Sequence, residues 1–235
     1  MNKIFQHGTL ELIMAGLYDG TLSFSELLEN GDDGIGTTHG LDGEVTILDG
    51  HAYQTKSSSE TVEITDLNTT TPFTSAHKAS TNNVKVNDTP LTFELLEKLV
   101  NEQKLNNTFL SIKAHGTIKN LQVRVAPKQE KPYPDFGTVA ANQPVFNYEN
   151  VTGTLVGDFG NDLYTGVMAG GWHIHFISDD RTVGGHVLSF DTDSVDLKID
   201  IFDTLNLHLP TNNTDFTKHD VDFAGLHAAI SQAEK

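Results

Sequence analysis

Helices are predicted where apolar residues recur every three or four positions behind a residue that can cap the first turn. Three segments have this spacing, and they follow Thr9, Ser23 and Thr92. The third predicts the longest helix, with its apolar residues on one stripe opposite Glu94 and Glu97. That stripe consists of Phe93, Leu95, Leu96, Leu99 and Val100. We expect this helix to pack over a sheet.

Strands are predicted where apolar and polar residues alternate. Residues 45–48 and 51–54 flank Asp49-Gly50, a dipeptide that favours the type I′ turn of a hairpin, so Glu44 stands at the open end of that hairpin. Further strands are expected at residues 60–65, 109–113, 118–125, 145–148, 151–159 and 195–203. Residues 34–37 and 66–83 are rich in glycine or in polar residues and predict loops. The pattern as a whole predicts a β-rich α+β fold with a few packing helices.

A cluster of prolines indicates a domain boundary. Lys131-Pro132-Tyr133-Pro134 interrupts the alternation, and we place the boundary near residue 127. Residues 1–127 are then expected to form an N-terminal lobe with a mixed sheet and helices. Residues 128–235 are expected to form a C-terminal β lobe that ends in a short helix or tail. A chain of 235 residues can bury a full core as one large domain or as two small ones.

Three histidines in the C-terminal third fit a single metal site. His173 and His175 are two residues apart on a predicted strand, so both side chains project from one face. If residues 179–182 form the loop of a hairpin, His186 on the returning strand pairs with His175 on that face. Three imidazoles with an open position are typical of a catalytic zinc, copper, iron or nickel site. Two histidines alone are often ordinary polar-face residues, so His186 decides the interpretation.

The composition excludes several classes of function. Cysteine is absent, which excludes disulfides, thiolate metal ligands and a cysteine nucleophile, so histidines and carboxylates must hold any metal. The formal net charge of −17 opposes binding to nucleic acid or to an anionic membrane. The chain has no apolar run of the roughly 18 residues that a membrane-spanning helix needs. We expect a soluble cytoplasmic protein.

Three pieces of the sequence together resemble the α-acetolactate decarboxylase family. They are Gly34-Ile35-Gly36-Thr37 running into Leu41-Asp42-Gly43-Glu44, the Arg124 strand followed by Lys131-Pro132-Tyr133-Pro134, and the histidine hairpin from Trp172 to His186. The similarity covers nearly the whole chain, and the order and spacing of the pieces agree with the family. It implies two lobes built on mixed sheets, a homodimer, and a zinc-dependent lyase that converts 2-acetolactate to acetoin and carbon dioxide in the butanediol pathway.

The resemblance also implies roles for individual residues. It assigns zinc to His173, His175 and His186. It assigns substrate contacts to Arg124 and Thr37, an acidic catalytic role to Glu44, and a second acidic role near the C-terminus to Glu234. Which glutamate delivers the proton stays open. Without the resemblance, a structural ion pair for Arg124 and a hydrated strand end for Glu44 are equally good interpretations.

Two other functions stay open at this point. A His-x-His pair with a distant histidine on a β scaffold also occurs in cupin-type dioxygenases and isomerases, which place a glutamate a few residues after the pair. Asp179 occupies that region here. The chain could instead be a metal-buffering or ligand-binding β protein without turnover. Among the other histidines, His39 lies near Thr37 and Glu44 in the sequence and needs to be placed by the structure.

Overall fold

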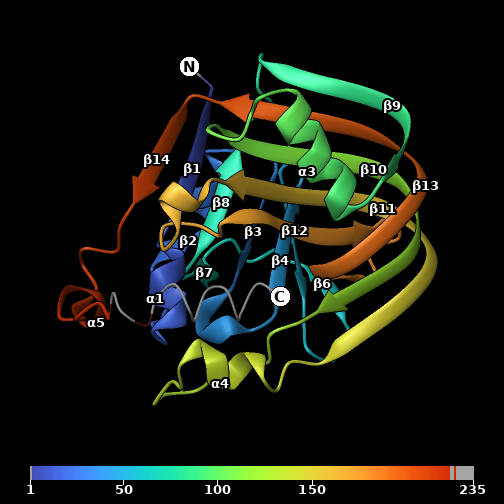
Figure 1. The fold of residues 1–235 in the computed structure, drawn as a ribbon. Helices are drawn as coiled ribbons and strands as arrows, with labels where there is room; N and C mark the ends of the chain where they lie inside the picture. Colours follow the sequence, from blue (N-terminus) through green and yellow to red (C-terminus); the bar gives the residue numbers. More distant parts are fainter. Residues whose placement is uncertain (1, 223–224, 226–235) are drawn as a thin grey trace.

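The computed structural model describes residues 2–222 and 225, and two large sheets of this part pack against each other (Figure 1). The strands of the larger sheet are β1 (Lys3–His7), β3 (Gly34–Thr37), β4 (Glu44–Leu48), β5 (His51–Thr55), β6 (Thr61–Glu63), β8 (Thr74–His77) and β14 (Thr204–His208). Their order is β14-β1-β8-β3-β4-β5-β6. A small sheet pairs β2 (Leu22–Ser23) with β7 (Thr70–Thr71). The β-rich fold with few helices agrees with the prediction.

The second large sheet consists of long strands that curve around the molecule (Figure 1). They are β9 (Asn83–Leu91), β10 (Phe109–Arg124), β11 (Val145–Gly160), β12 (Gly171–Ser178) and β13 (Gly184–Phe202). Their order is β10-β11-β12-β13-β9, and β13 also pairs with β10. The strands from β10 to β13 therefore close into a ring, which brings residues from distant parts of the chain to one place.

The predicted breaks within two of these strands are wrong. Residues 109–113 and 118–125 belong to the single strand β10, and residues 145–148 and 151–159 belong to β11. The pairing of β10 with β13 shifts register between Gly116 and Ile118, and Asn150 in β11 has a φ of 52°. Such bulges interrupt the alternation of side chains without ending the strand. The sequence pattern therefore shows a gap where the backbone continues.

Two segments predicted as loops contain buried strands of the seven-stranded sheet. Residues 34–37 form β3, and residues 74–77 within the predicted loop 66–83 form β8. The glycines of β3 are required by close packing against β8. A Cβ at Gly36 would lie 1.7 Å from Thr74 Oγ1, and one at Gly34 would lie 2.1 Å from the Ser75 carbonyl oxygen. Glycine here reflects a close approach of two strands, whereas the sequence pattern predicted a loop.

The three predicted helices are present behind their predicted caps. They are α1 (Leu10–Met14), α2 (Phe24–Leu28) and α3 (Phe93–Glu102). Each cap hydroxyl accepts a backbone N–H three residues ahead, as in the contact between Thr9 and Leu12. Leu96 and Val100 of α3 are buried against the five-stranded sheet, as expected. Two further short helices, α4 (Phe136–Ala140) and α5 (Thr214–Thr217), and the strands β1 and β9 were not predicted.

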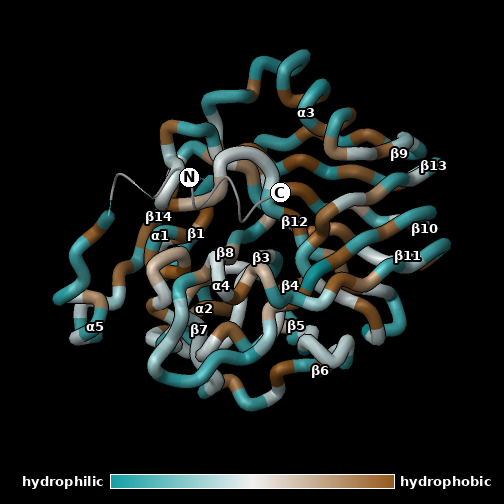
Figure 2. Tube along the Cα trace, turned by 60° about the horizontal axis from the view of Figure 1, so that its bottom comes forward, coloured by the Kyte–Doolittle hydropathy of each residue, from teal (hydrophilic) through white to brown (hydrophobic). Residues whose placement is uncertain are grey.

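The main apolar core lies on the side of the five-stranded sheet that α3 covers. Apolar residues of β10, β11, β12 and β13 meet there, and hydrophobic positions recur along these strands in Figure 2. The contact between the two large sheets is more polar. Lys113 of β10, for example, reaches Asp33 with its ammonium nitrogen 2.9 Å from Oδ1. His175 of β12 contacts Val45 of β4 in this polar layer between the sheets.

The large sheets exchange strands across the boundary predicted near residue 127. β9 and β10 precede that residue and belong with β11, β12 and β13, whereas β14 follows it and pairs in parallel with β1. The division into lobes 1–127 and 128–235 stays a prediction about folding units and does not coincide with the sheets.

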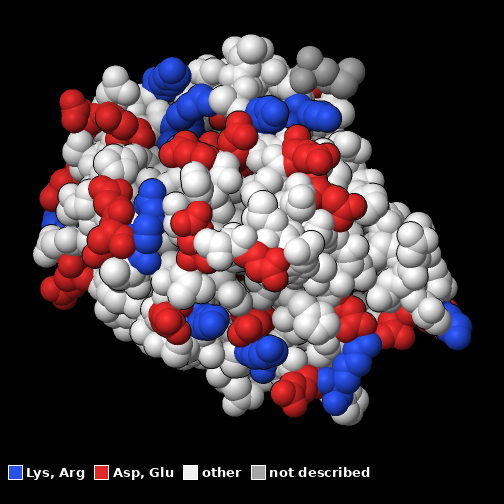
Figure 3. Space-filling model, turned by 180° about the vertical axis from the view of Figure 1, so that it is seen from behind, with Lys and Arg blue, Asp and Glu red and all other residues white. Residues whose placement is uncertain are grey.

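Acidic side chains are spread across the face shown in Figure 3, with lysine and arginine between them. This agrees with the excess of 32 acidic over 15 basic residues. Among the helices described by the structure, none is both long enough and apolar enough to cross a membrane.

Candidate metal centre

The strand register brings the three histidines and Arg124 together. β12 pairs with β13 so that His175 lies opposite His186, which confirms the predicted hairpin register. On its other side, β13 pairs with β10 so that His186 lies opposite Arg124. One row across three strands thus contains Arg124, His186 and His175, and His173 follows two residues along β12. The pairing with Arg124 could not be predicted, because it depends on closure of the ring of strands.

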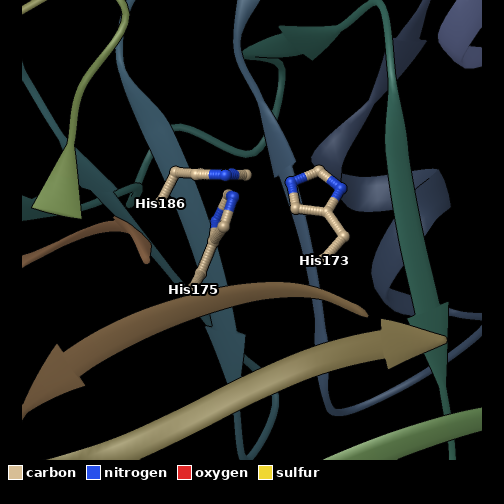
Figure 4. Close-up of side chains that lie close together, drawn as sticks. All are labelled: His173, His175 and His186. Atoms are coloured by element: carbon tan, nitrogen blue, oxygen red, sulfur yellow. The ribbon is translucent and has the colours of Figure 1, made fainter. Parts of the chain in front are cut away.

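The three imidazoles converge on a common point (Figure 4). One ligand atom from each of His173, His175 and His186 can be chosen so that all lie within 4.8 Å of one another. The ring centroids are 4.8–5.6 Å apart. A metal with three imidazole ligands requires nitrogen atoms about 2.0–2.1 Å from one ion, and a cluster of this size needs only small side-chain adjustments to meet that requirement.

His175 is held in the orientation that a metal ligand needs. Its Nδ1 donates to the backbone carbonyl oxygen of Val45 at 2.8 Å, which leaves Nε2 as the acceptor that faces the cluster. That Nε2 atom is buried and has no hydrogen-bond partner within the described chain. An unsatisfied buried nitrogen costs stability unless a ligand completes it, so this atom supports the fit of a metal ion to the site.

Burial keeps the three imidazoles in the form that binds metal. It lowers the pKa of His173 to about 3, and the nearby Arg124 guanidinium lowers it further. Burial also holds the pKa of His175 and of His186 well below the usual value of 6.5, and the neighbouring positive charges act in the same direction. Neutral imidazole is the metal-binding species, so at neutral pH the cluster has no protons to release before it binds an ion.

Glu44 and Arg124 both contact the histidine cluster. Glu44 begins β4, where its Oε1 accepts the backbone N–H of Ala126 at 3.1 Å and its Oε2 lies 3.5 Å from His175 Nε2. Arg124 ends β10 and donates from Nη2 to His186 Nε2 at 3.2 Å. Its guanidinium lies 6.0 Å from the centre of the Phe136 ring. A carboxylate and a guanidinium with several N–H donors therefore contact the same cluster of histidines.

The other predicted site residues have different positions. Thr37 is buried opposite Glu44, and its hydroxyl donates to the Gly43 carbonyl oxygen at 2.6 Å, which leaves its oxygen able to accept one more hydrogen bond. Glu234 lies outside the described residues. His39 does not line the site, because its Nδ1 accepts the backbone N–H of Gly20 at 3.0 Å on the surface.

Asp179 does not serve as a fourth ligand of the cluster. Its carboxylate is half-exposed and lies 3.2 Å from His115 Nε2, and it is not a member of the metal-ligating group. A cupin-type site needs an acidic ligand shortly after the histidine pair, so the geometry gives the oxygenase interpretation no support.

The cavity beside the histidines is lined by both polar and apolar side chains. Its polar side chains include Glu44, Thr37 and Arg124. Its apolar side chains are Leu10, Ile13, Met14, Leu41, Phe73, Ala126 and Phe136. Sequence reasoning assigned α1 to the core and Phe73 to a loop, and it missed Phe136, because nothing in their spacing shows that they surround a ligand. Such a cavity suits a small molecule with clustered oxygen atoms and short alkyl groups.

Known proteins resemble this chain over its full length. The family model described as alpha-acetolactate decarboxylase matches residues 4–223. An alpha-acetolactate decarboxylase of Lactococcus lactis subsp. cremoris is 39% identical over 236 residues, which cover 100% of this chain and 99% of the relative.

Solved structures agree with the sequence comparisons. Alpha-acetolactate decarboxylase from Bacillus subtilis strain 168 is similar with a TM-score of 0.92 and 32% identity, and 99% of each chain is covered. A Staphylococcus aureus protein of unknown function, described as similar to alpha-acetolactate decarboxylase, has the same TM-score and 37% identity, with 99% of this chain and 100% of that chain covered. Sequence and fold comparisons agree, and the chain belongs to the alpha-acetolactate decarboxylase family.

Proposed function

We propose that this protein is a carboxy-lyase that converts 2-acetolactate to acetoin and carbon dioxide at the histidine cluster. The observation that carries the proposal is the neutral group of His173, His175 and His186, the last two buried, with Arg124 and Glu44 beside it, in a chain of this family. The cavity supports the same reaction, because its polar side chains can hold the oxygen atoms of the substrate while its apolar side chains receive the methyl groups.

Zinc is the metal that we propose for the cluster, with His173, His175 and His186 as its protein ligands. Three imidazoles are a donor set that zinc accepts, and the buried Nε2 of His175, which has no hydrogen-bond partner among the described residues, needs such a partner. When bound, zinc would supply a Lewis acid that stabilises negative charge on the hydroxyl and ketone oxygens of the substrate, without redox chemistry.

Arg124 acts on the charge of the substrate. Loss of carbon dioxide breaks the bond to the carboxylate and leaves its electron pair on the neighbouring carbon, from which it spreads to the ketone oxygen to give an enediolate. The guanidinium offers several donors in a fixed plane, so it can hold the substrate carboxylate before the reaction or the developing oxyanion during it. Its contact with His186 and its position over Phe136 hold it at the edge of the cluster.

Glu44 completes the reaction by delivering a proton to the enediolate carbon. Its carboxyl group is fixed by the Ala126 N–H and faces the cluster, so a proton on Oε2 lies on one side of the bound substrate. Glu234 is the alternative donor or a second member of the acid pair. The donor reaches only one face of the carbon, and that face sets the chirality of acetoin. Thr37, which lines the same cavity, is proposed to accept a hydrogen bond from the substrate.

The test of this function is carbon dioxide release and acetoin formation from racemic 2-acetolactate. We expect activity that disappears after chelation and returns when zinc is added back. The absence of turnover by folded protein loaded with zinc would contradict the proposal. A homodimer in the cytoplasm is the proposed state of the enzyme, and light scattering on the purified protein would test the dimer.

A further inference from the structure

The three histidines differ in the hydrogen bonds that hold their rings. His175 donates its Nδ1–H to the Val45 carbonyl oxygen, and His186 accepts a hydrogen bond at Nε2 from the guanidinium of Arg124. The His173 ring forms no hydrogen bond within residues 2–222. Figure 4 shows one ring nitrogen of His173 turned toward the other two histidines and the second turned away from them. Metal-binding histidines nearly always donate that second N–H to a carboxylate, a carbonyl oxygen or a water, so His173 needs such an acceptor.

Asp158 lies where that acceptor is needed. It is directly opposite His173 in the pairing of β11 with β12, so the two side chains project from the same face of the sheet. Both side chains line one small cavity between the two large sheets, together with Ser75 and Gln6. Asp158 does not approach the other two ligands in the register, since His175 lies opposite Val156.

The two carboxylate oxygens of Asp158 differ in their hydrogen bonding. Its side chain is buried at 5% exposure, and Oδ2 accepts the hydroxyl of Ser75 from the facing sheet. Oδ1 is buried with no hydrogen-bond partner in the described part of the chain. A carboxylate held in this way by the opposite sheet presents a fixed acceptor to the cavity. Burial of such an oxygen is unfavourable unless a donor completes it.

A water molecule can join the two groups. The His173 ring and Asp158 share a cavity of about 10 Å³ but form no direct hydrogen bond. That volume is close to the minimum that one water needs, and the walls offer the two to four polar partners that keep a buried water in place. We propose that Asp158 is a positioning residue for His173, and that a single buried water carries the hydrogen bond from the outer His173 N–H to Asp158 Oδ1. This inference rests on the proposed metal site and adds the residue that orients one of its ligands.

The competing role for Asp158 is a structural one with His77. The His77 ring is buried, and both of its nitrogen atoms are without hydrogen-bond partners among the described residues. His77 and Ser75 are two residues apart on β8 and project toward the same layer. If Asp158 serves His77, its loss changes the stability of the fold and leaves the metal site unchanged.

Metal affinity of the zinc-free protein separates the two roles. Asp158→Asn keeps the shape of the side chain but removes the charge, and we expect zinc and cobalt to bind about 10- to 100-fold more weakly by competition with a chromophoric chelator. The visible absorption of the cobalt-loaded variant is also expected to change, because the His173 ring is free to turn. Asp200→Asn is the matched control, because Asp200 is a buried carboxylate of β13 held by Ser80 and Lys198, and its loss should leave metal affinity unchanged.

Two more variants keep the test decisive. Ser75→Ala removes the hydroxyl that fixes Asp158 and is expected to weaken metal binding in the same direction by a smaller factor. His77→Gln is expected to leave the affinity unchanged. Unaltered affinity in Asp158→Asn or Ser75→Ala, or an equal loss in His77→Gln, would overturn the inference. If the unmodified protein itself binds no metal at the histidines, the proposed metal site fails, which is a result distinct from tight binding that ignores Asp158.

Discussion

Adjacent residues in the middle of β12 are equally buried, but their side chains lie on opposite faces and differ in chemistry. Ile174 and Phe176 point into the main core and are at most 1% exposed. His175 points into the layer between the sheets and is also 1% exposed, yet its Nε2 lacks a hydrogen-bond partner among the described residues. Burial stabilises the first face through apolar contact, whereas it leaves the second face with a polar atom that only a ligand satisfies. The apolar contacts of the first face therefore offset the cost of the unsatisfied polar atom on the second face, where the metal is proposed to bind.

The largest expected effect comes from removing a histidine from the polar face of β12. His175→Ala removes one of the three proposed ligands, and we expect loss of bound metal and a fall in carbon dioxide release of at least about 10³-fold, because the charge-stabilising ion is gone. Elemental analysis and the rate measure the two effects. His115→Ala, at a half-exposed histidine that contacts Asp179, is the control and should retain both. Full activity in His175→Ala would show that the reaction does not use this cluster.

Next in size is the loss of the carboxyl group beside the cluster. Glu44→Gln keeps an oxygen that can accept the Ala126 N–H but cannot deliver a proton, so we expect kcat to fall by about 10²- to 10⁴-fold with the metal retained. Glu63→Gln, at the exposed partner of His51, should keep the full rate. An unchanged rate in Glu44→Gln would assign the proton to another group.

The substitution Phe176→Ala removes a large side chain from the apolar face of β12. Phe176 is fully buried in the main core, so the variant should lose about 3–5 kcal/mol of unfolding free energy through lost apolar contact and the cavity that remains. Urea unfolding of the zinc-free protein measures this effect. We expect His175→Ala to cost less than Phe176→Ala in the same experiment, since it also removes the unsatisfied nitrogen. A larger loss in His175→Ala would contradict the proposed contrast between the faces.

The smallest effect concerns a buried imidazole outside the cluster. Burial and the neighbouring His208 lower the pKa of His7 to about 4, below the usual 6.5 of an unfolded chain. The unfolded state then binds the proton more readily, so this contribution to stability is present above pH 6.5 and is lost as the pH falls toward 4. It amounts to roughly 2–3 kcal/mol.

His7→Asn should therefore show a weaker loss of unfolding free energy between pH 6.5 and pH 4 than the unmodified protein. Denaturant unfolding at a series of pH values measures the difference. His51→Asn, at an exposed histidine, is the control and should follow the unmodified protein. Parallel curves for His7→Asn and the unmodified protein would contradict the assignment of this pH dependence to His7.

The sequence predicted those features that depend only on residues close together in the chain. The helix caps at Thr9, Ser23 and Thr92 depend on residues three positions apart, and the register of His175 with His186 follows from a four-residue loop. These features need no knowledge of the rest of the fold. The metal-ligating group is therefore the part of the site that the sequence predicts best.

Features set by distant pairing could not be predicted. Arg124 meets His186 because β10 closes the ring against β13, and Asp158 meets His173 because β11 pairs with β12. The strand at residues 34–37 was hidden by the glycines that its close packing requires. Alternation shows which residues share a face of one strand, but it does not show which strand lies beside it.

The most direct test of the central claim is anomalous X-ray diffraction at the zinc edge from crystals of catalytically active, zinc-loaded protein. The account predicts one strong peak about 2.0–2.1 Å from a ring nitrogen of each of His173, His175 and His186. A peak elsewhere in protein that still decarboxylates 2-acetolactate, or none at the three histidines, would contradict it.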